Sequence, residues 1–177
     1  MIRMDSLMSN KYSGFSLIEI LFVLILVATL SSFSIAPLQN FLNKSKMEAL
    51  ANNLYTDIVS ARHISIQKNK RIVVCPLLES GKCGTDWSKG WQIMDDLGVI
   101  QIRYSDTKSK ITTSRTEPQI VFQPIGTSLG HNNTFLICDA DSNVTWRLIL
   151  NNQGRLRQVK GADPLQHASS CSTSPSD

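Results

Sequence analysis

Apolar residues are concentrated in one block near the start of the chain, from Phe15 to Leu38, with the sequence FSLIEILFVLILVATLSSFSIAPL. Between Phe15 and Leu30 the only ionisable side chain is that of Glu19. The block is long enough to cross a bilayer as a helix. An unpaired carboxylate inside such a helix costs about 2.5–3.5 kcal/mol on insertion scales. We therefore expect a transmembrane helix over residues 15–38 in which Glu19 has a function.

A second helical pattern follows this block, in which apolar side chains recur three and four positions apart. The apolar positions are Met47, Leu50, Leu54, Ile58 and Ala61. The polar positions expected on the opposite face are Lys44, Lys46, Glu48, Asn52, Asn53 and Asp57. Pro37 should kink or locally unwind the helix between the two patterns. We expect the amphipathic half over residues 39–69, and a helix from Phe15 to about Gln67 would be about 80 Å long at 1.5 Å per residue.

From Arg71 onward the pattern changes to short runs of β-branched and aromatic residues separated by turn-forming residues. The expected strands are 71–75, 91–94, 99–104, 119–122, 134–138 and 144–150, with a last short strand within 154–159. A long helix followed by consecutive strands predicts an α+β fold, with an antiparallel sheet packed on the helix. This β-rich domain should span residues 70–160. The Ser-rich tail, 161–177, should be loosely ordered except at Cys171.

Composition excludes several classes of protein. The chain has 177 residues and a formal net charge of +4, which predicts one small domain beside the apolar block and no general nucleic-acid binder. Its three histidines, His63, His131 and His167, are scattered, and the cysteine spacings do not match a metal site. We find no phosphate-binding loop and no nucleophile motif, so we expect no enzyme, no metal and no cofactor.

Three interpretations of the N-terminal block compete. A secretory signal would be cut near Ser34-Ile35-Ala36, but Pro37 follows directly and the apolar run is long for a signal. A plain membrane anchor would leave Glu19 without a role. The third interpretation rests on the segment Gly14-Phe15-Ser16-Leu17-Ile18-Glu19 and the apolar run after it, which resembles the processing motif of type IV pilins and type II secretion pseudopilins.

This resemblance implies a leader peptide over residues 1–14 that a prepilin peptidase removes after Gly14. It also implies methylation of the new N-terminus at Phe15. Glu19 would meet the N-terminal amine of a neighbouring subunit during filament assembly, which would relieve a carboxylate stranded in an apolar helix. The subunit would then sit in the inner membrane with a periplasmic domain, before assembly with other pilins into an extracellular or periplasm-spanning pilus.

The globular part resembles the minor pilin and pseudopilin group called FimT/GspH. The resemblance rests on Cys75-Pro76 through Cys83, followed by Trp87 and the dipeptide Gly90-Trp91. The four cysteines of the chain allow three connectivities. In an oxidising periplasm we expect Cys75–Cys83 to close a short loop and Cys138–Cys171 to attach the tail near the C-terminal strands.

A basic cluster lies late in the chain, where residues 147–160 read RLILNNQGRLRQVK without an acid. On a strand, Arg155 and Arg157 would point to one face about 6.5–7 Å apart, a spacing that suits neighbouring phosphates. Gly154 would let the backbone approach a partner closely, and the remaining contacts would come from Gln153, Arg147 and Lys160, with neutral donors also at Asn151 and Asn152. The alternative is a solvated strand face, or pairing of the arginines with Asp139 and Asp141.

Gly154-Arg155-Leu156-Arg157 resembles the G-R-x-R motif of DNA-binding FimT minor pilins from naturally competent bacteria. The resemblance implies a minor type IV pilin that binds double-stranded DNA without sequence preference during natural transformation. The alternatives are a structural subunit that primes assembly at a pilus tip and a type II secretion pseudopilin, neither of which would bind DNA.

Overall fold

A computed structural model describes residues 14–32, 35–78, 82–105, 109–161 and 171. The described chain divides into two compact units, Met1–Phe41 and Leu42–Asp177. Residues 1–13 lie outside the described part, and with them most of the expected leader peptide. Of the expected tail, only Gly161 and Cys171 are described.

The first unit contains the helix α1, Leu17–Ser32, and the first residues of α2, Ile35–Lys68. The apolar side chains from Leu17 to Val27 are all exposed, on every side of α1. Pro37 falls in the first turn of α2, where its missing N–H costs no helical hydrogen bond. Within the described ranges, no helix combines the length and the apolar content needed to cross a membrane.

In the second unit, α2 packs its predicted apolar stripe into the core. Leu50, Leu54, Ile58 and Ala61 are buried, and Met47 packs against them at the edge. The sequence prediction of this stripe is therefore confirmed. The predicted polar face is exposed except at one position. Asp57 is 3 % exposed.

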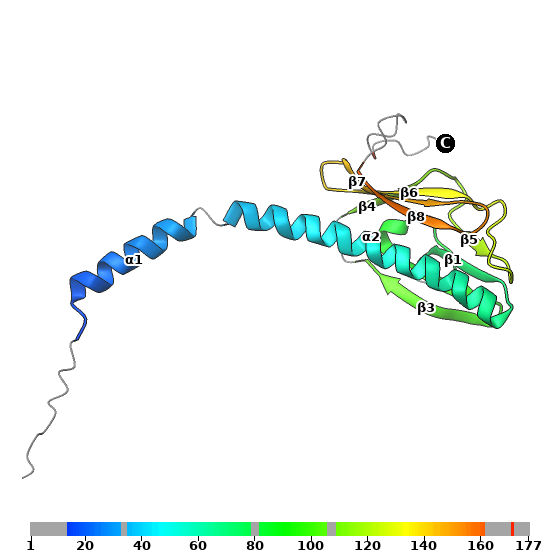
Figure 1. Cartoon of the computed structure of the whole chain (residues 1–177), viewed down its shortest axis with the longest axis horizontal. Coiled ribbons are helices and arrows are strands. Elements are labelled where there is room, and N and C mark those ends of the chain that lie inside the picture. The colour runs from blue at the N-terminus through cyan, green and yellow to red at the C-terminus, as the bar shows by residue number, and fades with distance from the viewer. Residues whose placement is uncertain (1–13, 33–34, 79–81, 106–108, 162–170, 172–177) are drawn as a thin grey trace, which may run out of the picture. The chain divides into compact units, whose positions relative to one another are not determined.

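Eight strands follow α2, and they form two antiparallel sheets. The strands are β1 (Ile72–Pro76), β2 (Gly90–Asp95), β3 (Gly98–Tyr104), β4 (Lys110–Thr113), β5 (Ile120–Phe122), β6 (Asn133–Cys138), β7 (Val144–Leu150) and β8 (Leu156–Lys160). One sheet has the order β3-β2-β1-β5 and the other β4-β6-β7-β8 (Figure 1). The expected α+β fold is confirmed, but its strands are divided between two sheets where one was expected.

One continuous core joins both sheets to α2. It contains apolar side chains from α2, from β1, β2 and β5 of the first sheet, and from β4, β6 and β7 of the second. A short 3₁₀ helix, Trp87–Lys89, adds Trp87, whose ring meets Phe135 of β6 edge to face at 4.9 Å between centroids. Because both sheets share the helix as their packing partner, α2 fixes the position of each sheet relative to the other.

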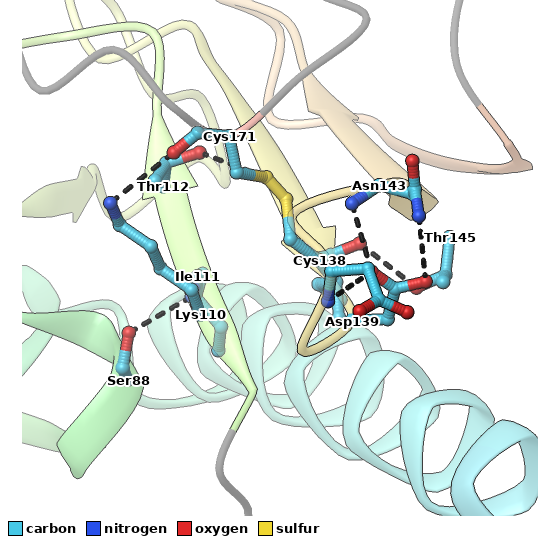
Figure 2. The surroundings of a disulfide bond; sticks show 11 residues. Ser88, Lys110, Ile111, Thr112, Cys138, Asp139, Asn143, Thr145 and Cys171 are labelled. Carbon is cyan, nitrogen blue, oxygen red and sulfur yellow. Dashed lines mark hydrogen bonds between the residues drawn. A yellow bond between two sulfur atoms is a disulfide. The ribbon is translucent and has the colours of Figure 1, made fainter.

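Two disulfides join the same cysteines that we expected to pair, Cys75 with Cys83 and Cys138 with Cys171. Cys171 lies against β4 and the β6–β7 turn (Figure 2). Its backbone N–H donates to the carbonyl of Ser142 at 3.1 Å, and Lys110 Nζ donates to its carbonyl at 3.2 Å. The tail is therefore attached to the second sheet at this residue.

Candidate nucleic-acid interface

The expected processing residues lie at the start of the described chain. Gly14, Phe15 and Ser16 precede α1 without helical structure, and all three are exposed. Nothing lies within 4 Å of a Cβ built on Gly14. Glu19 lies in the first turn of α1, where its backbone N–H donates to the carbonyl of Ser16 at 3.0 Å. A carboxylate in the first turn is favourably placed relative to the helix dipole.

Arg157 lies in β8, an edge strand of the second sheet, and Arg155 directly precedes that strand. Arg157 is paired with Ile149 of β7, and Leu156 with Leu150. Alternation along the strand places Arg155 and Arg157 on one face and Leu156 on the other, packed against the core. Both arginines are exposed. Within the described ranges neither side chain has a hydrogen bond or an ion pair.

Of the two acids that are the alternative partners of these arginines, Asp139 accepts hydrogen bonds within its own turn, and neither acid forms an ion pair with Arg155 or Arg157 among the described residues. Asp139 accepts hydrogen bonds from the backbone N–H groups of Asp141 and Asn143, at 3.0 and 2.8 Å. These bonds close the turn between β6 and β7 (Figure 2). Over the described part of the chain, the ion pairs are Arg103–Asp57 and Arg115–Glu117. The arrangement therefore leaves two neighbouring guanidinium groups available to an external anion.

The turn before β8 is held in place by its surroundings. Gly154 has a φ of +74°, and a Cβ at this position would overlap the carbonyl oxygen of Gly126 and lie 3.1 Å from Arg62 Nε. From the sequence, Gly154 is expected to let the backbone approach an external partner closely. The structure shows that the close approach is to the chain's own loop, since Gly154 is buried against Gly126.

The remaining residues of the predicted cluster do not share the exposed face. Arg147 is 8 % exposed, and its Nε donates to the carbonyl of Gly161 at 2.9 Å, so it supports the end of β8. Lys160 is exposed but lies three strand positions after Arg157 and therefore on the opposite face, with Nζ 5.7 Å from the centroid of the Trp146 ring. Gln153 is exposed in the turn. Period-two alternation could have separated Lys160 from the arginines in the sequence alone.

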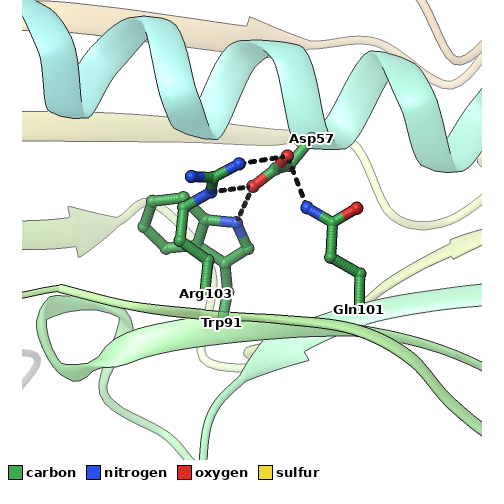
Figure 3. A network of polar contacts seen from close by, with 4 residues as sticks. All are labelled: Asp57, Trp91, Gln101 and Arg103. Carbon is green, nitrogen blue, oxygen red and sulfur yellow. Dashed lines mark hydrogen bonds and ion pairs between the residues drawn. The ribbon is translucent and has the colours of Figure 1, made fainter.

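A second polar site, which the sequence patterns do not predict, lies between α2 and the first sheet. Asp57 of α2 accepts hydrogen bonds from Trp91 Nε1 at 2.8 Å, Gln101 Nε2 at 2.9 Å and Arg103 Nη2 at 3.1 Å, and also from Arg103 Nε (Figure 3). Burial by itself raises the pKa of the Asp57 carboxyl, but the hydrogen bonds from Arg103, Trp91 and Gln101 outweigh it and hold that pKa below its usual range. The signal in the sequence is positional, because Asp57 lies three positions after Leu54 and four before Ala61, which places it on the apolar stripe itself.

Comparisons with known proteins agree with this architecture. The family model described as the type II transport protein GspH matches residues 50–154. Crystal structures of the type IV minor pilin FimU of Pseudomonas aeruginosa in two space groups superpose with TM-scores of 0.55 and 0.53, both at 18 % sequence identity. They cover 66 % and 63 % of this chain, and 90 % and 91 % of theirs. The minor pseudopilin EpsH from the type II secretion system of Vibrio cholerae gives a TM-score of 0.48 at 13 % identity, covering 65 % of this chain and 97 % of that one.

A search of curated proteins finds no match. The FimU structures show the fold, whereas the family model matches more than half of the residues, from the middle of α2 to the turn before β8. The matched range ends at Gly154, so Arg155 and Arg157 lie just beyond it. On this match, the chain is a member of the family of the type II transport protein GspH.

Proposed function

We propose that this GspH-family subunit is a minor type IV pilin that binds double-stranded DNA without sequence preference during DNA uptake. The observation that carries the proposal is the pair Arg155 and Arg157, exposed on one face of β8 and without a partner among the described residues. The resemblance of Gly154–Arg157 to the G-R-x-R motif of DNA-binding FimT minor pilins supports the same function.

The physical reason is that guanidinium groups form strong, charge-assisted hydrogen bonds with phosphate oxygens. Contacts to phosphates position a protein on DNA but carry no sequence information. A subunit that captures any DNA it meets therefore needs cations at fixed positions and no base contacts. The turn that holds Gly154 against Gly126 supplies that fixed position for Arg155.

The N-terminal part of the proposal concerns anchoring and assembly. Residues 1–14 are a leader that a prepilin peptidase removes, residues 15–38 hold the subunit in the inner membrane and then in a filament with other pilins, and Glu19 meets a neighbour's N-terminal amine. The exposed apolar surface of α1 supports this role. Mass spectrometry of the mature protein should find Phe15 as a methylated N-terminus. A mature chain beginning at Pro37 would refute the proposal.

The test of DNA binding is a salt titration with the full chain in non-ionic detergent and two duplexes of unrelated sequence. Wild type should bind both equally, with a dissociation constant of about 10⁻⁴–10⁻⁶ M at physiological salt. Arg155→Gln with Arg157→Gln removes two phosphate contacts. The slope of log affinity against log salt should therefore become shallower by about 1.8. Unfolding of this variant should differ from wild type by no more than about 0.5 kcal/mol, because both side chains are exposed.

A charge-matched control separates the motif from the net charge of the chain. Lys82→Gln with Lys89→Gln removes two exposed cations from the region between β1 and β2, and it should leave DNA binding near wild type. If the arginine variant binds as tightly as this control, DNA binding through the motif is refuted. The FimU-like fold would then favour the alternative of a structural subunit that primes a pilus tip, or a pseudopilin of type II secretion.

A further inference from the structure

Three segments far apart in the sequence meet at the end of the domain that carries Arg155, and none of them contains an acid. They are residues 62–71, 119–131 and 147–160. Eight of the chain's 18 lysines and arginines lie in these segments, and none of its 14 acids. The whole chain has a formal charge of +4, so the residues outside these segments sum to −4. The modest net charge of the chain therefore conceals a strong separation of charge.

The contacts between the segments are specific. Arg62 of α2 donates from Nε to the carbonyl of Gly126 at 2.8 Å. Ser128 donates from its backbone N–H to the carbonyl of Asn152 at 3.0 Å, and from Oγ to the carbonyl of Asn151 at 2.8 Å. Together with the packing of Gly154 against Gly126, these bonds join the C-terminal part of α2, the loop after β5 and the turn before β8. We call this arrangement the clamp.

The C-terminal end of α2 brings three further cations to the clamp. Lys68 is the last residue of α2, Lys70 and Arg71 lead into β1, and all three are exposed. Throughout the described ranges, none of their side chains has a hydrogen bond or an ion pair. Ile66, two residues before Lys68, lies against the clamp, because a Cβ built on Gly126 would meet its Cδ1 at 2.6 Å.

We propose that Lys68, Lys70 and Arg71 form a second set of phosphate contacts for the same DNA duplex that Arg155 and Arg157 bind. The inference rests on the proposed function and extends its surface beyond the motif. Lysine and arginine side chains are long, so cations on both sides of a rigid clamp can reach phosphates of one duplex. A polyanion is the partner that fits, since the three segments carry cations and contain no acid.

The experiment compares the triple variant Lys68→Gln/Lys70→Gln/Arg71→Gln with a control that removes three exposed lysines elsewhere, Lys44→Gln/Lys82→Gln/Lys89→Gln. Both are measured as full chains in non-ionic detergent, by fluorescence anisotropy with one labelled duplex over a range of salt concentrations. Five phosphate contacts predict a wild-type slope of about −4.5, and loss of three predicts about −1.8. Affinity near 0.1 M salt should fall roughly tenfold or more in the triple variant and far less in the control.

The outcomes separate this inference from the proposed function. If the triple variant binds like the control while Arg155→Gln/Arg157→Gln binds weakly, the second contact set is wrong and the motif remains the DNA site. If the triple variant loses affinity and the motif variant does not, the second set is supported and the role of the motif is refuted. If wild type does not bind duplex DNA in 50 mM salt, both are refuted. The circular dichroism spectrum of each variant should match that of wild type, since every side chain that these variants replace is exposed.

Discussion

Arg103 and the pair Arg155–Arg157 are strand arginines on two different sheets, and their surroundings are opposite. The guanidinium of Arg103 pairs with a carboxylate that is 3 % exposed, which also accepts hydrogen bonds from Trp91 and Gln101. The guanidinium groups of Arg155 and Arg157 are exposed and lie in a segment without acids. The first arginine is satisfied inside the molecule, whereas the other two have their charges directed outward.

The difference shows how the same side chain can stabilise the fold in one place and be left free for the proposed ligand in another. A buried carboxylate that loses its partner is left as an uncompensated charge and an unsatisfied acceptor, which is costly. An exposed arginine contributes little to folding, so its position can be used for a ligand without loss of stability. A substitution at Asp57 should therefore change stability and leave DNA binding intact, whereas substitutions at Arg155 and Arg157 should do the reverse.

The largest effect on stability is expected at the buried pair of Asp57 and Arg103. Asp57→Asn should lower the free energy of unfolding by about 2–3 kcal/mol at neutral pH, because Arg103 loses its counter-charge and buried hydrogen bonds are rearranged. The pKa of Asp57 is lower in the folded protein than in the unfolded chain. Its contribution is therefore complete above about pH 3.9 and is lost as the pH falls through the folded-state value. Urea unfolding of the full chain in detergent, followed by circular dichroism of the β-rich domain, should show wild type and variant converging in acid.

The control for this prediction is Glu48→Gln, which removes an exposed acid from the same helix and should change stability by no more than about 0.5 kcal/mol. DNA binding by Asp57→Asn should equal that of wild type under conditions where the variant is folded. A difference between wild type and Asp57→Asn that stays constant from pH 7 to pH 3 would contradict the assigned charge of Asp57.

A comparable or smaller effect is expected at the turn before β8, where Gly154 can be compared with Gly130 of the loop between β5 and β6. Gly154 and Gly130 have φ values of +74° and +77°, and nothing lies within 4 Å of a Cβ built on Gly130. Gly130→Ala should cost about 1 kcal/mol from backbone strain alone. Gly154→Ala should cost about 1–2 kcal/mol more, because its Cβ also displaces the Gly126 carbonyl. DNA affinity should fall only in Gly154→Ala. Equal stability of the two variants would contradict the clamp.

The fold was predictable to the extent that local patterns determine it. The stripe from Met47 to Ala61 identified the buried face of α2, and seven strands lie close to their predicted positions. The strand β4 was missed because its sequence, KITT, contains one apolar side chain and carries little pattern of its own. The division into two sheets depends on pairings between distant strands, such as β1 with β5 and β4 with β6. Local periodicity does not encode such pairings.

The candidate site was predictable in part. Alternation correctly placed Arg155 and Arg157 on one exposed face, with Leu156 in the core. The burial of Arg147, the packing of Gly154 on Gly126 and the pairing of Asp57 with Arg103 all depend on long-range contacts.

Membership of the GspH family, whose pilin-like members are structural subunits, confirms the expectation that the chain is not an enzyme.

The position of β8 at the edge of its sheet has a consequence for the protein's own copies. An edge strand presents unpaired backbone groups that can add a strand from another molecule, and charged side chains on the edge oppose such pairing. Arg155, Arg157 and Lys160 place three positive charges along this edge. Two copies that approach edge to edge would therefore repel each other, and added salt would weaken that repulsion within a Debye length of about 10 Å at 0.1 M. The cations that would attract a polyanion thus also keep the subunit from aggregating through its own sheet.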